Sequence, residues 1–436
     1  MLPGTCVVIS PLIALMHDQL RSARANGIRA ATLTSADADW RETQDAFRAG
    51  ELDLLYVAPE RASQPAFREF LNSAPLCLFA IDEAHCVSEW GHDFRPDYRM
   101  LRGLMDAFPQ VPRLALTATA DRQTRADVMA QLGIAEDGLV LAGFDRPNIR
   151  YAIRHRDNPV RQLTNLMESE PGPGIVYAQT RRKVEDLADK LAAATGRAVR
   201  PYHAGLDAEV RAANQSAFVA SEDMVIVATV AFGMGIDKPD VRFVAHVGVP
   251  KSIEGYYQET GRAGRDGAPA ETLTLFGPDD IRLRRSQIDE GLAPPERRSA
   301  DHGRLNALLG LAEALACRRK TLLGYFGETE ISCGNCDLCD TPADVFDGTV
   351  AVRKALSAML RTEEWFGAGH LIDILIGNET DKVRQRGHMN LPTYGVGKEY
   401  DRRQWQAVFR QMMGHDLVRP DPERHGALRM TEGARP

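Results

Sequence analysis

Short apolar runs alternate with amphipathic stretches over most of this 436-residue chain, and few folds accommodate that order. The apolar runs have the character of strands, and the stretches 181–194 and 208–220 have that of helices. Strands separated by helices build parallel sheets. The segments "FDRPNIR" (144–150) and "SEPGPG" (169–174) mark a change of unit, so we expect two α/β lobes. The predicted strands are 6–10, 52–58, 76–82, 113–117, 174–178, 224–229, 242–247 and 271–276.

Two adjacent carboxylates, Asp82 and Glu83, follow the apolar run 76–81. That run lacks the alternation of a half-exposed strand, so it fits a strand covered on both faces. The carboxyl end of such a strand is where open α/β sheets bind ligands. One carboxylate there suits a hydrated Mg²⁺ on a nucleotide phosphate, and the other can act as a base toward water. For the pair taken alone, a strand-end Asp followed by a capping Glu remains the alternative.

The predicted second lobe contains "YYQETGRAGRDG", in which Gln258, Arg262 and Arg265 are spaced i, i+4 and i+7. This spacing predicts one helical face. Two arginines on such a face can bind a phosphate and stabilise the charge that develops during phosphoryl transfer. A solvated helix end is the alternative reading of these glycines and arginines.

Four of the seven cysteines lie within residues 317–339, which indicates a metal site more than a disulfide framework. Four thiolates suit a closed tetrahedral zinc site. The pattern Cys-x-x-Cys-x-x-Cys also fits an iron–sulfur cluster. The candidate ligands are Cys317, Cys333, Cys336 and Cys339, and we expect Cys6, Cys77 and Cys86 to be buried thiols.

The net charge of −7 is unevenly distributed along the chain. Residues 347–436 carry 14 Lys and Arg against 12 Asp and Glu, whereas the remainder carries 39 against 48. Because nucleic-acid binding depends on local patches, this distribution permits a DNA-facing tail. No apolar run reaches the ~18 residues of a membrane helix, and the N-terminus lacks a signal-peptide pattern, so we expect a cytoplasmic protein.

Several motifs together resemble the motor of RecQ-type superfamily 2 DNA helicases. "WGHDFRPDY" is the most distinctive of them, because "DEAH" alone marks several helicase groups. The resemblance runs from about residue 5 to the end of the chain. In order, the motifs are "SPLIALMHDQ", "YVAPER", "DEAH", "WGHDFRPDY", "ALTATA", "YHAGL", "ATVAFGMGIDKPDVRFV" and "YYQETGRAGRDG".

The resemblance implies a role for each matching residue. Asp82 would bind the Mg²⁺ water and Glu83 would activate the attacking water. Arg265 would be the arginine finger, and an aromatic-rich loop would sense single-stranded DNA by stacking on bases. Ordinary core packing is the alternative for the aromatics of that loop. The other implied residues are His85, Thr117 and Thr119 for coupling, Gly235, Asp237, Gln258 and Arg262 for the far wall of the ATP cleft, and Trp90, Phe94 and Arg95 for the loop.

The same resemblance implies zinc at the four cysteines and a winged helix after them. The last residues predict a helix, a strand, a turn at 420–426 and a second strand. Arg402, Arg403 and Arg410 are candidates for phosphate contacts, and His425 would lie at the wing tip. The expected units are a first lobe (1–143), a second lobe (144–279), a zinc-binding subdomain (280–346) and a winged helix (347–436).

The 436 residues contain no glycine-rich loop ending in Lys-Ser or Lys-Thr to hold the β- and γ-phosphates. The string "TYGVGKEY" has Pro392 and Glu399 where that loop needs a glycine and a hydroxyl. In the family this loop precedes the strand that begins here at Cys6. We therefore expect an N-terminally incomplete first lobe with uncovered apolar surface, whether from a fragment, a misplaced start or a decayed gene.

We expect an ATP-dependent 3′-to-5′ DNA helicase of RecQ type that uses ATP, Mg²⁺ and Zn²⁺, acts in repair or recombination, and associates with the bacterial nucleoid. We expect the chain as written not to hydrolyse ATP without an upstream phosphate loop, because such a loop positions and neutralises the phosphates. A non-hydrolysing DNA-structure-binding fragment that uses the zinc and winged-helix modules is the alternative. A nuclease or other metalloenzyme has little support, since no second carboxylate cluster accompanies "DEAH".

Overall fold

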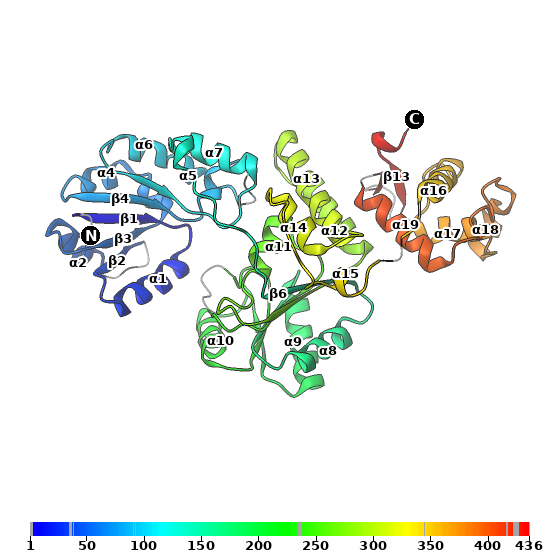
Figure 1. The fold of residues 1–436 in the computed structure, drawn as a ribbon, viewed down its shortest axis with the longest axis horizontal. Coiled ribbons are helices and arrows are strands. Elements are labelled where there is room, and N and C mark those ends of the chain that lie inside the picture. The colour runs from blue at the N-terminus through cyan, green and yellow to red at the C-terminus, as the bar shows by residue number, and fades with distance from the viewer. Residues whose placement is uncertain are drawn as a thin grey trace.

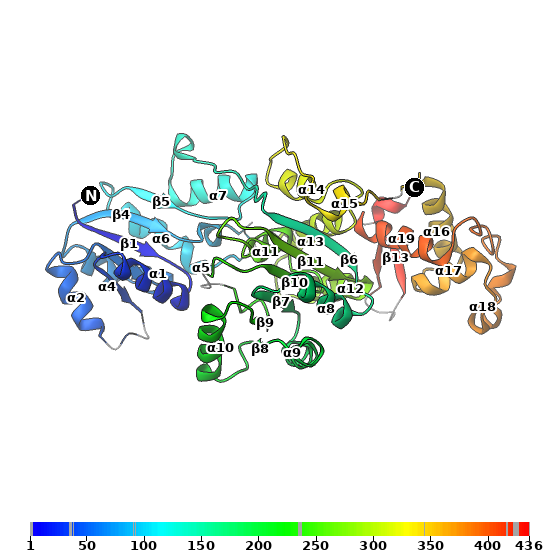
Figure 2. The ribbon, with the colours of Figure 1, turned by 60° about the horizontal axis from the view of Figure 1, so that its bottom comes forward.

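The structure is a computed structural model with two sheet-containing lobes, a helical subdomain and a small C-terminal domain (Figure 1). The N- and C-termini lie at opposite ends of an elongated molecule (Figure 2). Among the described residues, no helix is long and apolar enough to cross a membrane. The described residues are 3–34, 37, 39–89, 91, 93–233, 238–343, 345–415, 417–421 and 427–435.

The first lobe is built on a five-stranded parallel sheet of order β2-β3-β1-β4-β5. Its core is apolar, and Phe79 and Ile81 of β4 are fully buried. The strands are β1 (Thr5–Ile9), β2 (Ala30–Leu33), β3 (Leu54–Val57), β4 (Leu76–Ile81) and β5 (Arg113–Ala115). The helices are α1 (Ile13–Ala25), α2 (Trp40–Arg48), α3 (Pro59–Ala62), α4 (Pro65–Leu71), η1 (Ala84–Val87), α5 (Pro96–Arg99), α6 (Leu101–Asp106), α7 (Arg122–Leu132) and η2 (Glu136–Gly138).

Strand β5 forms one edge of this sheet, and apolar side chains are exposed there. Leu114 is 42% exposed and Leu116 is 49% exposed. The uncovered apolar surface expected for the first lobe stays a prediction.

The second lobe is built on a six-stranded parallel sheet of order β6-β11-β10-β7-β9-β8. Helices α8 and α9 cover one face, and α11 packs on the other together with the helical subdomain. The strands are β6 (Ile149–His155), β7 (Gly174–Ala178), β8 (Val199–Tyr202), β9 (Val225–Ala228), β10 (Phe243–Val247) and β11 (Ala270–Phe276). The helices are α8 (Pro159–Ser169), α9 (Arg181–Thr195), α10 (Ala208–Ala220) and α11 (Ile253–Thr260).

The helical subdomain shares its core with the second lobe. Leu308, Leu322 and Phe326 of the subdomain belong to the same buried cluster as Tyr151 and Tyr256 of the lobe. The two parts are therefore one continuously packed body. The subdomain helices are α12 (Pro278–Asp289), α13 (Pro295–Ala312), α14 (Arg318–Tyr325) and α15 (Asp337–Asp340).

The C-terminal domain has its own core around the buried Trp405 and Phe409 of helix α19. An antiparallel pair of strands follows that helix, which confirms the predicted winged-helix arrangement. The elements are α16 (Thr349–Arg361), α17 (Ala368–Ile376), α18 (Asp381–Gln385), η3 (His388–Asn390), α19 (Arg402–Gly414), β12 (Val418–Pro420), β13 (Leu428–Met430) and η4 (Glu432–Ala434).

The eight predicted strands are present, but the apolar pattern did not predict strands β2, β6 and β8. All three lie at sheet edges. An edge strand has one neighbour and tolerates polar residues and proline, as with Arg150 in β6 and Pro201 in β8. Strand β2 has only four residues, two of them alanine, which is too short to produce a clear pattern.

Candidate active site and metal centre

Asp82 and Glu83 stand where strand β4 ends, as predicted. Glu83 has a left-handed backbone conformation, with φ of 47° and ψ of 46°. A non-glycine residue in that region is strained by about 1–3 kcal/mol and persists only where the surroundings fix it. This turn directs the chain away from the sheet immediately after the two carboxylates. The side chain of Glu83 makes no capping hydrogen bond to the short helix that follows, so the alternative reading of Glu83 as a helix cap does not apply.

Polar groups from two other elements hold Asp82 in place. Its Oδ2 atom accepts hydrogen bonds from Ser10 Oγ at 3.4 Å and Gln19 Nε2 at 3.2 Å. Its backbone carbonyl accepts one from the Tyr98 hydroxyl at 3.1 Å. The carboxylate is half-buried, so it fits an outer ligand of a hydrated Mg²⁺.

Glu83 connects the strand end to the "ALTATA" segment through His85. The two side chains lie 3.3 Å apart, and His85 Nδ1 lies 3.0 Å from Thr117 Oγ1. Burial, reinforced by the charge of Asp82, raises the pKa of Glu83 to about 7. A carboxylate with such a pKa is suited to general base chemistry near neutral pH. Thr119 donates its backbone amide to Thr117 Oγ1, and its own hydroxyl is buried.

The second lobe supplies the opposite wall of the site. Gln258 Nε2 lies 3.5 Å from Glu83 Oε1, and the guanidinium of Arg262 is buried and bonded to the Gly233 carbonyl. A cavity of about 700 Å³ separates the walls. Its lining residues include Glu83, His85, Asp93, Arg95, Lys251, Gln258, Glu259, Arg262, Arg284, Arg297 and Arg304.

The prediction that Gln258, Arg262 and Arg265 share one helical face is wrong. Helix α11 ends at Thr260, and both arginines follow it in turns. Because glycine is a poor helix former, the helix ends at Gly261, before either arginine is reached. Arg262 is buried in the cavity wall, whereas Arg265 is exposed and outside its lining.

The loop that follows "DEAH" is anchored at its base. Gly91 is required there, because a Cβ atom would lie 2.2 Å from the His85 carbonyl oxygen. Arg95 donates to the Pro11 carbonyl at 2.9 Å and pairs with Asp93, and half-buried Phe94 lies at the rim. Trp90, Gly235, Asp237 and His425 lie outside the described residues.

The four predicted cysteine ligands converge. Their sulfur atoms all lie within 4.8 Å of one another, and Cys317 and Cys336 Sγ are 3.9 Å apart. Sulfurs bound to one tetrahedral zinc at about 2.3 Å are separated by about 3.8 Å, so the cluster fits that ion. Lys320 donates its backbone amide to Cys317 Sγ at 3.5 Å, and Asn335 donates to Cys333 Sγ at 3.4 Å.

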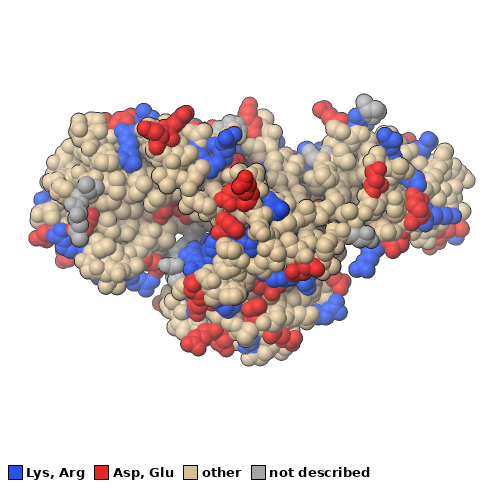
Figure 3. All heavy atoms as spheres, in the orientation of Figure 1, with Lys and Arg blue, Asp and Glu red and all other residues tan. Residues whose placement is uncertain are grey.

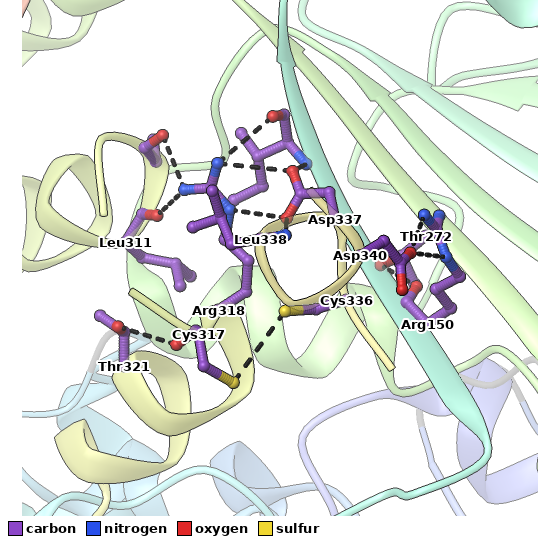
Figure 4. A network of polar contacts seen from close by, with 12 residues as sticks. Arg150, Thr272, Leu311, Cys317, Arg318, Thr321, Cys336, Asp337, Leu338 and Asp340 are labelled. Atoms are coloured by element: carbon purple, nitrogen blue, oxygen red, sulfur yellow. Dashed lines mark hydrogen bonds and ion pairs between the residues drawn. The ribbon is translucent and has the colours of Figure 1, made fainter. Parts of the chain in front are cut away.

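Charged side chains hold this cluster against strand β6 (Figure 4). Arg318, next to Cys317, pairs with Asp337, next to Cys336, at 3.0 Å. Asp337 also accepts the Ile153 amide at 2.9 Å. The metal centre is therefore tied to strand β6 of the second lobe through Asp337, whose carboxylate binds both the Ile153 amide and Arg318.

The C-terminal arginines differ in their surroundings. Arg403 is exposed, while Arg402 forms an ion pair with Asp373. Arg410 is ion-paired to half-buried Glu313 of the zinc-binding subdomain at 3.2 Å, so its charge is partly compensated. Its role as a phosphate contact stays a prediction.

Sequence reasoning missed several residues that shape the site. Ser10 and Gln19 lie in the quoted "SPLIALMHDQ" motif, which could have signalled them, and Tyr98 ends "WGHDFRPDY". Arg297 and Arg304 reach the cavity from helix α13 and carried no motif signal.

Four family models match the chain. They are a DEAD/DEAH box helicase (residues 2–128), a helicase conserved C-terminal domain (158–267), a RecQ zinc-binding domain (278–340) and an RQC domain (342–436). The third of these matches contains all four cysteines of the cluster.

Similar proteins are found among bacterial relatives and solved structures. An ATP-dependent DNA helicase RecQ from Haemophilus influenzae is 42% identical over 99% of this chain and 70% of its own. A protein of the same name from Bacillus subtilis is 37% identical over 96% of this chain and 71% of its own. The fold resembles Dbp5 of Saccharomyces cerevisiae, with a TM-score of 0.51 at 15% identity over 77% of this chain and 79% of that one.

We predict one zinc ion per chain at the four cysteines. Replacing Cys336 by Ser should release the zinc and lower soluble yield severalfold, because zinc-binding energy is also folding energy. Metal analysis and yield measure this, and Cys77→Ser, in strand β4, is the matched control. Iron with visible absorbance, or a folded protein without metal, would contradict the prediction.

We predict that Glu83→Gln stabilises the magnesium-free protein at high pH. In the folded wild-type protein the pKa of Glu83 is about 7, above the ordinary value of 4.5. The buried carboxyl therefore lowers the free energy of unfolding as the pH rises from 4.5 through 7. The variant should gain up to about 3 kcal/mol at pH 8 and little below pH 4.5. Denaturant unfolding at both pH values measures this, with exposed Glu60→Gln as the control. An equal gain at both pH values would refute the assignment.

Proposed function

The chain belongs to the RecQ family of ATP-dependent DNA helicases, and from this premise we propose that it is a 3′-to-5′ DNA helicase of DNA repair and recombination. The observation that carries the proposal is the convergence of Glu83 from one lobe with Gln258 and Arg262 from the other on one cavity. A motor driven by nucleotide hydrolysis needs such a cleft, because closure around the phosphates is what moves the lobes.

Each residue of the cleft has a chemical task in this proposal. Asp82, oriented by Ser10 and Gln19, holds the hydrated magnesium on the nucleotide. Glu83 takes the proton of the attacking water, since its pKa is raised to about 7. Magnesium, when bound, neutralises phosphate charge. The remaining assignments are His85, Thr117 and Thr119 for coupling, and Gly235, Asp237, Gln258, Arg262 and Arg265 for the far wall.

Arg262 and Arg265 were expected to stabilise the phosphate charge together from one helical face, and in this proposal they act separately. The buried position of Arg262 in the cleft wall supports a phosphate contact in the conformation described. Exposed Arg265 acts as the arginine finger only after the lobes close further.

DNA contacts come from two regions in this proposal. Trp90, Phe94 and Arg95 form a loop that stacks on single-stranded bases without reading sequence. Arg402, Arg403 and His425 of the winged helix contact the duplex backbone. On the face drawn in Figure 3, basic and acidic residues are intermixed, so DNA binding depends on these local groups.

A non-hydrolysing DNA-structure-binding protein is the second candidate. It would use the zinc-binding and winged-helix modules alone, and DNA-stimulated ATP turnover separates the two. We also propose the division into units 1–143, 144–279, 280–346 and 347–436, and a cytoplasmic, nucleoid-associated location.

We predict that the chain, joined in frame to a phosphate-loop segment of the family, separates a 3′-tailed duplex but not a 5′-tailed one. Arg262→Ala should reduce ATP turnover by on the order of 1,000-fold, because removal of a phosphate-stabilising arginine costs that much. Exposed Arg161→Ala should leave turnover unchanged. The unmodified chain should show no DNA-stimulated turnover. Full activity of Arg262→Ala would contradict the proposed site.

We predict that Arg403→Ala lowers the log–log salt slope of forked-DNA binding by about 0.9, as for one lost phosphate contact. Arg402→Ala should lower the slope less, because Asp373 already pairs with that side chain. Titrations at several salt concentrations measure this, and Arg161→Ala is the control. An unchanged slope for Arg403→Ala would show that its side chain does not meet DNA.

A further inference from the structure

Phe94 is in contact with two guanidinium groups from different parts of the molecule. Arg99, in helix α5 of its own lobe, lies 5.5 Å from the Phe94 ring centre. Arg297, in helix α13 of the zinc-binding subdomain, also lies 5.5 Å from it. Both distances are within the range of a cation–π interaction.

The loop backbone takes part in the same contact. Arg297 Nη1 donates to the Glu89 carbonyl at 3.3 Å, and Arg99 pairs with the Glu89 carboxylate at 2.7 Å. Arg297 therefore touches both ends of the segment 89–94. Asp93 of this segment and Arg297 both line the cavity that also contains Glu83.

The position of Arg297 is not explained by the stability of its own helix. It is the third residue of α13, which begins at Pro295. A cation in the first turn of a helix is disfavoured, because the positive end of the helix dipole lies there. Among the described residues, Arg297 instead contacts the Phe94 ring and the Glu89 carbonyl of the loop.

We propose that Arg297 is a positioning residue that latches the loop 88–95 to the zinc-binding subdomain and competes with single-stranded DNA for Phe94. The competition rests on the proposed stacking role of Phe94. A base that stacks on the ring must displace a guanidinium group, so DNA binding and the contact with α13 oppose each other. The base of the loop stays anchored through Arg95 to the Pro11 carbonyl and through Ser88 to Asp127. Release therefore frees Phe94 and leaves the base of the loop and the "DEAH" segment in place.

The test measures binding of a labelled oligothymidylate to the full chain. Arg297→Ala should bind roughly two- to five-fold more tightly, the factor expected for loss of one exposed cation–π contact. Loss of a positive charge acting through a phosphate contact would weaken binding instead. Arg298→Ala is the matched control, because Arg298 is the next residue and contacts the Asp289 carbonyl of α12 rather than the loop. In a Phe94→Ala background, Arg297→Ala should give no tightening.

Amide hydrogen exchange without DNA tests the latch separately. The amide of Gly91, which is bonded to the Ser88 carbonyl, should exchange faster in Arg297→Ala but not in Arg298→Ala, whereas the amide of Arg95, bonded to the Cys86 carbonyl at the anchored base, should be unchanged in both. Unchanged exchange at Gly91, or weaker DNA binding equal to that of Arg298→Ala, would overturn the latch. Faster exchange with unchanged DNA binding in Phe94→Ala would support the latch and refute the proposed stacking role of Phe94.

Discussion

Two buried arginines at the start of helix α14 fix the position of the zinc-binding subdomain, and the wall of the cleft depends on that position. Arg318 is 6% exposed and Arg319 is 1% exposed. Burial of a charge is costly unless it is paired and hydrogen-bonded. Arg318 pairs with Asp337, while Arg319 pairs with Asp145 and donates to the Ile149 carbonyl. Removal of either partner would leave an uncompensated charge, so the subdomain has one favourable position on β6.

The position of the zinc-binding subdomain also determines where helix α11 and the residues that follow it lie in the cleft. Helix α14 supplies Tyr325, whose hydroxyl donates to Glu254 of helix α11, and α13 supplies Arg304, whose Nε lies 3.7 Å from the same carboxylate. Helix α11 bears Gln258 and leads directly to Arg262. The metal centre thus supports the far wall of the cleft through two helices, although none of its four cysteines lines the cavity.

The sequence predicted what depends on strong local patterns, and it missed what depends on long-range contacts. Apolar runs located eight strands, and the spacing of Cys333, Cys336 and Cys339 located the metal centre. The edge strand β6 was not predicted because Arg150 and Arg154 interrupt its apolar pattern. Arg150 forms ion pairs with Glu271 and Asp340, which are distant in sequence. The failure at Arg262 and Arg265 has a local cause instead, since the helical spacing was extended past Gly261, where the helix ends.

Residues of the cleft also lower the stability of the folded protein. Glu83 combines a left-handed backbone with a buried carboxylate beside Asp82, and each feature alone disfavours the folded state. Arg262 Nε and Thr119 Oγ1 are buried there without a hydrogen-bond partner in the described structure. The same is true of described side chains outside the cleft, such as Arg197 Nε and Arg319 Nε, so an unsatisfied buried donor does not by itself mark the site. Because such a donor costs about 1–3 kcal/mol, Arg262 Nε adds to the cost that Glu83 imposes on the folded state. A phosphate contact at Arg262 would offset part of that cost, so nucleotide binding and the stability of this part of the fold are expected to be linked.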